Sequence, residues 1–507
     1  MIAADVTLDR AFAIGDVDPR LFGSFVEHLG RCVYDGIYEP GHPQADAEGF
    51  RQDVLDLVRE LGVTMVRYPG GNFVSGYNWE DGVGPREARP RRIDLAWRST
   101  ETNQIGTNEF MSWCKKAAVE PMLAVNLGTR GPLEAAQYLE YCNIPGGTTL
   151  SDQRRTDGAD VPHRVKFWCL GNEMDGPWQT GQTSACDYGV RARETAKAMR
   201  AVDGEVILAA CGSSGRDMAT FGAWEYDVLD ACFDHVDFIS IHVYFRDTAD
   251  DQSHFLTSID MMDAYIGEVI AIADAVAAKR RSSKRIMLSF DEWNVWYKAR
   301  TPEHQRQPGF PVAPRLLEEI YDMQDALVVG GALITLINHC DRVKAACLAQ
   351  LVNVIAPIMT EPGGPAWRQT IFHPFAETAK RARGVALRAA ITSPMLKPAG
   401  AEAVPALCLC AIHDTATDRL TMFALNRDPQ SDMQINVDLR GFVGRWQAGD
   451  SLSLHHADRH AVNTREAPNT VVPLLNDTLA VAGDRMTAVL PPASWNLFVL
   501  SGSGRPS

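Results

Sequence analysis

The sequence predicts a (β/α)8 barrel followed by an antiparallel β-sandwich. Between about residues 20 and 380, short β-prone apolar runs alternate with longer helical patterns, and after about residue 385 only short β-prone segments remain. Strands that alternate with helices form parallel sheets with right-handed crossovers, and a closed barrel of this kind needs eight strands. Eight strands are predicted, at 21–27, 64–68, 122–126, 165–170, 206–211, 238–243, 286–290 and 333–338.

The segments between these strands have the residue spacing of helices. In 50–61 the apolar residues recur every three or four positions, and Gly62 follows as a stop signal. The same pattern predicts helices at 132–142, 188–202, 255–278 and 316–329. An open doubly wound sheet would alternate similarly, but no GxGxxG or phosphate-binding loop follows a strand. This argues against that fold and against a nucleotide-binding oxidoreductase.

The sequence pattern of the C-terminal part is typical of a jelly-roll-like sandwich, with short β-prone segments separated by Asp, Asn, Gly and Pro. A chain of 507 residues is expected to form more than one domain. We expect an N-terminal strand (1–18) that joins the C-terminal sheet, a catalytic barrel (19–384) and a β-sandwich (385–507), with the last residues, 501–507, frayed. The strands expected in the sandwich are 5–12, 407–412, 420–426, 434–437, 452–454 and 495–500.

Composition narrows the possible partners and compartment. The formal net charge of −15 argues against nucleic-acid binding, which needs clustered Lys and Arg. No stretch approaches ~20 uninterrupted apolar residues, so no membrane span is expected. The first residues lack the basic region and apolar core of a signal peptide. Eleven cysteines without a CxxC pair favour free thiols, and we expect a cytoplasmic protein.

Two glutamates stand at the ends of predicted barrel strands. Glu173 follows the fourth strand and Glu292 follows the seventh, on opposite sides of the barrel mouth. In such barrels, reactive side chains gather at the carboxyl ends of the strands. Hydrolysis of a glycosidic bond needs one carboxyl group to protonate the leaving oxygen and another to capture the oxocarbenium-like carbon. The pair therefore predicts a glycoside hydrolase rather than two ordinary salt bridges.

Several longer motifs carry a family resemblance. In their order along the chain they resemble those of family 51 glycoside hydrolases, the α-L-arabinofuranosidases. The order of predicted elements resembles that of the family over essentially the whole chain, and the most specific motifs all lie in the predicted barrel. They are GSFVEHLGR at 23–31, YDGIY at 34–38, RYPGGNF at 67–73, YNW at 77–79, WCLGNEMDGPW at 168–178 and DEWNVWY at 291–297.

The resemblance implies a retaining, exo-acting α-L-arabinofuranosidase that acts on arabinan, arabinoxylan or their oligosaccharides. Glu173 matches the general acid/base of the family and Glu292 its nucleophile, and their carboxyl groups should lie ~5–5.5 Å apart. Members of the family are often hexamers, so the resemblance also implies a homo-oligomer. The residues that match the family's binders of the arabinofuranose hydroxyls are Glu27, Asn72, Asn172, Tyr244 and Gln350.

Supporting residues and aromatic side chains complete the predicted site. A guanidinium at Arg67 would keep Glu292 ionised, and His242 is interpreted as a histidine that orients a neighbouring carboxylate. We expect no metal and no cofactor, because neither His242 nor His28 belongs to an HxH or HxxxH pattern. Tryptophans in the loops favour a carbohydrate cleft, with Trp97 and Trp296 as substrate contacts. The five tryptophans are Trp79, Trp97, Trp178, Trp293 and Trp296.

Two other functions remain open from the sequence. The same barrel and the same two glutamates would serve a β-xylosidase or a β-glucanase, which differ in the sugar that they accept. A function of a different class is a non-catalytic carbohydrate-binding protein. The paired strand-end carboxylates argue against it, since burying such charges in a sugar pocket is costly without a chemical use.

Overall fold

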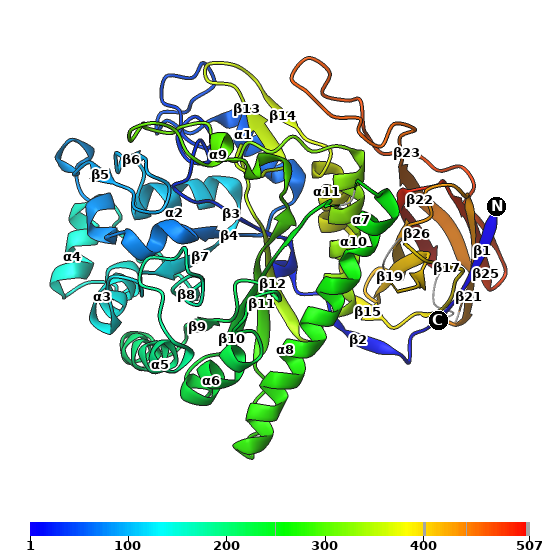
Figure 1. The fold of residues 1–507 in the computed structure, drawn as a ribbon, viewed down its shortest axis with the longest axis horizontal. Helices are drawn as coiled ribbons and strands as arrows, with labels where there is room; N and C mark the ends of the chain where they lie inside the picture. The colour runs from blue at the N-terminus through cyan, green and yellow to red at the C-terminus, as the bar shows by residue number, and fades with distance from the viewer. Residues whose placement is uncertain (249, 399–401, 443, 503–507) are drawn as a thin grey trace.

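The computed structural model describes residues 1–248, 250–398, 402–442 and 444–502. Within these ranges, eight parallel strands close into a barrel, and two further sheets form a sandwich beside it (Figure 1). The predicted fold class is confirmed. Around the barrel the strands follow the order β3 (Gly23–Phe25), β4 (Met65–Tyr68), β7 (Glu120–Val125), β8 (Phe167–Leu170), β9 (Ile207–Cys211), β10 (Phe238–Phe245), β11 (Met287–Val295) and β12 (Val343–Leu348), and β12 pairs with β3.

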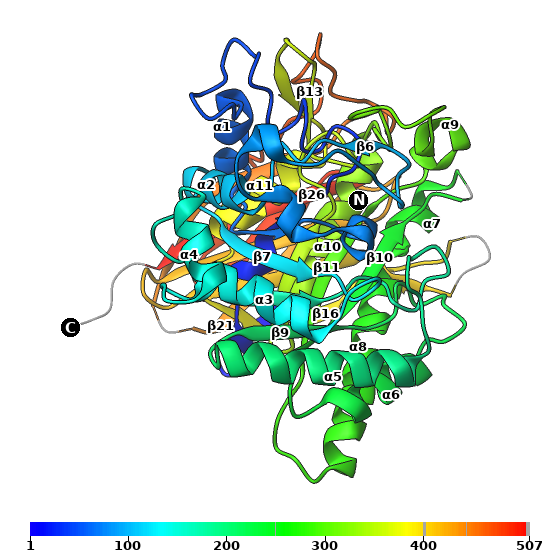
Figure 2. The ribbon, with the colours of Figure 1, turned by 90° about the vertical axis from the view of Figure 1, so that its left-hand side faces the viewer.

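Helices cover the outside of the barrel, as Figure 2 shows for α3, α5 and α6. In α1, residues at helical spacing such as Val54 and Val58 are buried, and Gly62, with a φ of 78°, ends the helix. The helix predicted at 255–278 is two helices, α7 and α8, which meet at Ser258. The helices are α1 (Gln52–Leu61), α2 (Thr107–Ala117), α3 (Pro132–Asn143), α4 (Thr149–Thr156), α5 (Ala185–Val202), α6 (Ala223–Cys232), α7 (Gln252–Thr257), α8 (Ile259–Lys279), α9 (Pro302–Gln305), α10 (Met323–Asn338) and α11 (Phe372–Arg381).

The eighth barrel strand is β12, so the strand predicted at 333–338 is wrong. Those residues form the second half of α10. The sequence predicts a helix at 316–329, so the observed helix begins and ends later than predicted. Nearly every residue of α10 is buried, because the helix packs against barrel elements and also contacts strands of the sandwich. A helix covered on all sides has no polar face and loses the helical periodicity in its sequence. Its β-branched and apolar run therefore resembles a buried strand.

Both ends of the chain contribute to the sandwich. β1 pairs in parallel with β21 and antiparallel with β16, which confirms that the N-terminal segment joins the C-terminal sheets. In Figure 1 this blue strand lies among the orange strands. One sheet has the order β16 (Ala390–Thr392), β1 (Ile2–Asp9), β21 (Met433–Gly441), β25 (Arg485–Leu490) and β24 (Ala480–Ala482). The other has the order β2 (Ala13–Asp16), β15 (Val385–Leu387), β19 (Leu407–Asp414), β20 (Arg419–Asn426), β26 (Ser494–Gly502), β22 (Trp446–Leu454) and β23 (Leu474–Leu475).

The remaining strands form three short ribbons. Domain boundaries after residues 18 and 384 stay predictions. Residues 501 and 502 belong to β26 rather than to a frayed end, and 503–507 lie outside the described residues. The ribbons are β5 (Arg92–Ile93) with β6 (Thr100–Glu101), β13 (Ile358–Thr360) with β14 (Ala366–Arg368), and β17 (Met395–Leu396) with β18 (Val404–Pro405).

Strand β20, in the middle of its sheet, is buried on both faces. Met422 and Ala424 belong to the core between the two sheets, whereas Phe423 and Leu425 belong to the core shared with the barrel. Successive side chains of a strand point to opposite faces, so one strand serves both cores. On the barrel side, α10 packs against β19, β20 and β26. This packing fixes the sandwich to the barrel.

Two expectations from composition concern the whole chain. None of the helices in the described ranges is long and apolar enough to cross a membrane. All eleven cysteines are free thiols, and most of them are buried.

Gly330 is expected to be essential for the contact between α10 and the sandwich. A Cβ atom at this position would lie 2.4 Å from the ring of Trp495. Overpacking of this kind costs ~1–3 kcal/mol, more than the ~1 kcal/mol by which alanine is favoured over glycine in a helix. Gly330→Ala should therefore lower the thermal midpoint in scanning calorimetry.

The matched control is Gly267→Ala on the exposed face of α8, where an added Cβ atom meets nothing within 4 Å. Here only the helix propensity changes, so the midpoint should rise slightly. If both variants rise together, the proposed close contact between helix and sandwich is wrong.

Candidate active site

The carboxyl ends of the barrel strands surround a cavity of about 540 Å³. Because parallel strands end on one side of a barrel, side chains far apart in the sequence converge there. Arg67, Asn172 and His242 are buried behind this cavity, each at most 2% exposed. The other predicted site residues all line it: Glu27, Asn72, Trp97, Glu173, Tyr244, Glu292, Trp296 and Gln350.

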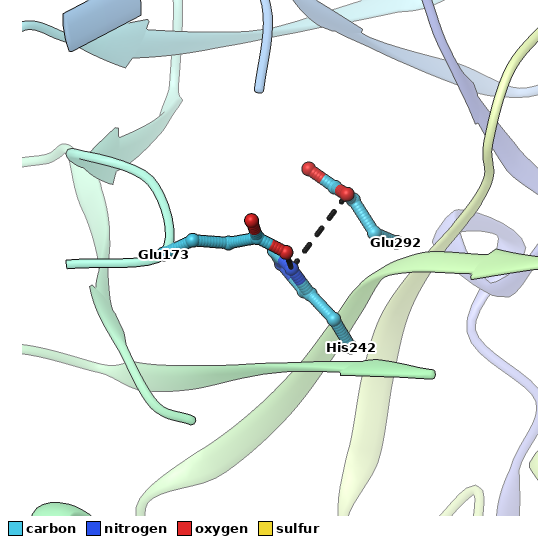
Figure 3. A group of neighbouring side chains, drawn as sticks. All are labelled: Glu173, His242 and Glu292. Carbon is cyan, nitrogen blue, oxygen red and sulfur yellow. Dashed lines mark hydrogen bonds and ion pairs between the residues drawn. The ribbon is translucent and has the colours of Figure 1, made fainter. Parts of the chain in front are cut away.

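The side chains of the two predicted catalytic residues, Glu173 and Glu292, converge, and the His242 ring reaches toward both carboxyl groups (Figure 3). One oxygen of Glu173, one oxygen of Glu292 and a ring nitrogen of His242 lie within 4.8 Å of one another. His242 on β10 pairs in register with Glu292 on β11, which places them side by side. Retaining glycosidases hold their carboxyl groups ~5–5.5 Å apart, and inverting ones ~6.5–9.5 Å apart. The spacing here fits retention.

Arg67 and His242 pair with the buried carboxylates. Arg67 Nη1 donates to Oε1 of Glu292 at 2.7 Å, and its Nε lies 3.8 Å from Oδ2 of Asp291. His242 Nε2 lies 3.1 Å from Oδ1 of Asp291. Burial raises the pKa of Asp291, but the positive charges of Arg67 and His242 outweigh it and hold this pKa below its ordinary value. Buried charges are tolerable in such pairs and costly alone.

His242 is a cation at neutral pH. Burial lowers its pKa, but the negative charge of Glu292 and the hydrogen bonds to Asp291 and Glu173 raise it to about 10. The distances among Glu173, His242 and Glu292 would suit a metal ion. However, an imidazolium has no free lone pair to ligate a metal. Both ring nitrogens are also within 3.1 Å of carboxylates, so this group does not fit a metal site.

Further contacts fix the orientation of the two glutamates. Trp178 Nε1 donates to Oε2 of Glu173 at 2.6 Å, and the Tyr244 hydroxyl donates to Oε2 of Glu292 at 2.9 Å. Glu173 has a φ of 44°, a left-handed conformation that is rare outside glycine and clusters at functional sites. A Cβ atom at Gly71 would lie 3.2 Å from Oε1 of Glu292, so only glycine leaves this carboxylate undisturbed.

Glu27 is the centre of a second group in the cavity. Its Oε1 accepts from the Phe73 amide and from Trp97 Nε1, and its Oε2 accepts from Gln350 Nε2, all at 2.9 Å. Burial raises the pKa of Glu27 to about 8. Oε1 of Gln350 is buried, and no described residue donates a hydrogen bond to it. An unpaired acceptor on a cavity wall is available to a hydroxyl group of a ligand.

Some predicted contacts differ from the structure. Asn172 does not line the cavity: its Oδ1 accepts from Arg67 at 2.7 Å and its Nδ2 donates to Asn72 Oδ1 at 3.2 Å. Its direct contact with a sugar stays a prediction. Trp79 stacks on Tyr138 and Trp293 is fully buried, so these two tryptophans belong to the core. Trp97, Trp178 and Trp296 line the cavity.

Sequence reasoning missed most of the outer cavity wall. Trp178 was named only as one of several tryptophans, and its bond to Glu173 was not foreseen. The end of the fifth strand carries serines, and the arginines lie in loops without a recognisable motif, so no signal singled them out. The missed wall residues are Ser214, Asp217, Met218, Arg246, Arg300 and Arg306.

The buried His242 cation is expected to make the stability of the protein depend on pH. Its pKa is raised from 6.5 to about 10 in the folded chain, so its stabilising contribution is complete below about 6.5 and is lost as the pH rises to about 10. Thermal midpoints of wild type and His242→Gln should therefore differ most at or below pH ~6.5 and converge as the pH rises toward 10.

His163→Gln provides the control. Burial lowers the pKa of His163 to about 4, so this side chain is neutral throughout the alkaline range. Its variant should differ from wild type by a constant amount between pH ~7.5 and ~10. A His242→Gln difference that is also constant over this range would show that His242 is not a buried cation.

Comparison with known proteins agrees with this geometry. Residues 57–265 match the family described as Alpha-L-arabinofuranosidase 1 domain, and residues 291–494 match the Alpha-L-arabinofuranosidase C-terminal domain. An intracellular exo-α-(1→5)-L-arabinofuranosidase of Halalkalibacterium halodurans is 52% identical over 98% of this chain and 99% of its own length. An exo-α-(1→6)-L-arabinofuranosidase of Bifidobacterium longum is also 52% identical, over 97% of this chain and 96% of its own.

A solved structure extends the likeness to three dimensions. The family 51 α-L-arabinofuranosidase AbfB of Bifidobacterium longum superposes with a TM-score of 0.94 at 48% identity, covering 98% of this chain and 99% of its own. These matches span both the barrel and the sandwich. The chain therefore belongs to the α-L-arabinofuranosidases of glycoside hydrolase family 51 and is a glycoside hydrolase.

Proposed function

We propose that this chain removes terminal non-reducing α-L-arabinofuranosyl units from arabinan, arabinoxylan or their oligosaccharides, with retention of configuration. One observation carries the proposal: oxygens of Glu173 and Glu292 approach within 4.8 Å on the wall of a single cavity. The family membership supports the sugar. The names of the relatives favour it over a β-xylosidase or a β-glucanase.

The charges around the site support the division of roles. Three carboxylates, those of Glu173, Asp291 and Glu292, surround two cations, Arg67 and His242. Such a group is neutral when one carboxyl carries a proton. Asp291 and Glu292 both lie against Arg67, whereas Glu173 does not, which favours Glu173 as the general acid. A general acid is needed there, because its side chain faces the nucleophile across the cavity.

In the first step, the carboxylate of Glu292 attacks the anomeric carbon while Glu173 gives its proton to the departing oxygen. The glycosidic bond breaks and an ester bond to Glu292 forms with inverted configuration. In the second step, Glu173 takes a proton from water, and the water oxygen attacks the anomeric carbon and displaces Glu292. Two inversions restore the α configuration in the released arabinose.

The group around Glu27 is suited to hold the sugar. Gln350 Oε1 has no described donor, and Asn72 lies on the same cavity wall. A ligand that failed to donate to such a buried group would lose ~1–3 kcal/mol, so hydroxyl placement discriminates between sugars. Trp97 and Trp296 line the same cavity and can cover the apolar surface of a furanose.

We further propose a cytoplasmic location, and we expect a homo-oligomer. The relative from Halalkalibacterium halodurans is named intracellular, and eleven free thiols suit a reducing compartment. The subunit number stays a prediction from the family resemblance.

Azide should distinguish the two glutamates. In Glu292→Ala, azide can occupy the place of the lost nucleophile and attack opposite the leaving group, which gives the β-L-arabinofuranosyl azide. In Glu173→Ala, an activated nitrophenyl leaving group departs without a proton, and azide attacks the covalent intermediate to give the α-azide. On natural oligosaccharides, Glu173→Ala should lose roughly 10²- to 10⁴-fold in rate. The anomeric configuration of each azide is read by NMR.

Glu466→Ala, at an exposed glutamate that pairs with its neighbour Arg465, is the control and should keep wild-type kinetics and form no azide product. Exchanged configurations in the two variants would reverse the assigned roles. Nitrophenyl β-xyloside or β-glucoside hydrolysed faster by wild type than the α-L-arabinofuranoside would refute the proposed sugar.

A further inference from the structure

The active-site cavity continues into a second one. A cavity of about 390 Å³ lies beside the first, and the two share four lining residues: Ser214, Asp217, Tyr244 and Arg246. Ser258 and Met261, at the start of α8, line its far side. The joined space thus extends well beyond Glu27 and Gln350, which line only the first cavity. We call the part lined by Ser214, Asp217, Met218, Arg246, Arg300 and Arg306 the outer arm.

The outer arm lies on the side from which a leaving group would depart. His242 and Tyr244 point from β10 to the two catalytic carboxylates. Arg246 directly follows the end of β10, two residues beyond Tyr244, and lines both cavities. Ser214 is tied to this region through its amide, which donates to Asp175, two residues after Glu173.

The charge of this arm is opposite to that of the chain. Three arginines line it, Arg246, Arg300 and Arg306, against one acidic residue, Asp217. The chain as a whole has a net charge of −15. Among the described residues, no acidic side chain forms an ion pair with Arg246 or Arg306. Elsewhere in the second cavity the protein does neutralise an arginine: Arg216 forms two hydrogen bonds to Glu268, at 2.7 and 2.6 Å.

Arg300 is held in place within this positive region. Its Nε donates to the Trp296 carbonyl at 2.6 Å, and its guanidinium carbon lies 3.8 Å from the centre of the Trp296 ring. Burial and then the positive charge of Arg246 lower the pKa of Arg300 to about 10. An anion bound between Arg246 and Arg300 would relieve this repulsion. The carboxylates of the sugar site lie deeper and already have Arg67 and His242 as partners.

We propose that the outer arm recognises a carboxylate on the leaving group, so that the enzyme prefers arabinofuranosyl units attached to acidic, uronic-acid-bearing oligosaccharides. Arginine binds carboxylates through its planar fork of donors, and a positive rim raises the rate of encounter with an anionic substrate. This inference rests on the proposed arabinofuranosidase activity and specifies the group that leaves.

A matched pair of synthetic substrates tests the inference. In 4-(carboxymethyl)phenyl and 4-(carbamoylmethyl)phenyl α-L-arabinofuranoside, a methylene group separates the charge from the phenol, so the two leaving groups differ mainly in charge. Wild type should hydrolyse the carboxylate with a kcat/KM about threefold to tenfold above that of the amide at low salt. The ratio should fall toward one at ~0.5 M salt, because exposed charges are then screened.

Substitutions that remove a positive charge and a substitution that removes a negative charge should change the ratio in opposite directions. Arg246→Gln and Arg306→Gln should each lower the ratio, and the double variant should bring it to about one. Asp217→Asn removes the opposing charge and should raise it. The control Arg193→Gln, on the outer helix α5, should keep the wild-type ratio.

A wild-type ratio of one at low salt, or a ratio that the double variant leaves unchanged, overturns the inference even though both substrates are cleaved. If the neutral amide substrate is not cleaved at all, the proposed activity itself fails, and the two failures are thus distinguished.

Discussion

The site depends on a small buried group in which Arg67 and His242 hold three carboxylates together. Arg67 reaches Glu292 and Asp291 from β4, and His242 reaches Asp291 and Glu173 from β10. None of these charges would be stable alone in the interior, because an unpaired buried ion is strongly destabilising. The strands that carry them lie on different sides of the barrel, so the group forms only when the barrel is closed. Closure of the fold and assembly of the proposed catalytic carboxylates are therefore one event.

The sandwich contributes to the site although none of its described residues lines the cavity. Glu319 accepts hydrogen bonds from the backbone amides of Tyr297, Lys298 and Ala299, which fixes the turn that carries Trp296 and Arg300. Lys298 Nζ pairs with Asp322 at 3.0 Å and with Asp325 at 2.7 Å, and Asp322 also caps the start of α10. On its other side, Asp322 lies 3.1 Å from Nδ1 of His460, in a loop of the C-terminal part. One wall of the cavity is thus positioned through α10 by its packing against the sandwich.

Much of this arrangement could be predicted from the sequence, because barrel strands end in polar residues wherever the chemistry lies. Glu173 follows the end of β8 and Glu292 lies in the last four residues of β11, and the spacing of the strands places them opposite each other. The eighth strand could not be recognised, because α10 is buried on all sides and lacks periodicity. Because the eighth strand was predicted at 333–338 and not at β12, Gln350 did not stand at a predicted strand end. Only the family resemblance identified Gln350 as a site residue. Trp178, Arg246, Arg300 and Arg306 act from loops, where position depends on packing between distant segments rather than on local pattern. For the same reason, Asn172 was expected to contact the sugar although it bridges Arg67 and Asn72.

The difference between residues at strand ends and residues in loops has a physical consequence for substrate specificity. The side of the cavity proposed to hold the sugar is built from strand ends whose positions are fixed by the barrel and by buried ion pairs, so changing any one residue there leaves another charge or donor unpaired. The outer arm is built from segments after β9, β10 and β11, and its Arg246 and Arg306 are exposed, so a substitution at either removes a charge without exposing a buried partner. Selection on the leaving group can therefore act on the arm while the sugar side stays unchanged. A positive arm on a negative protein is then best understood as a feature of substrate choice, because neither the fold nor the catalytic carboxylates require it.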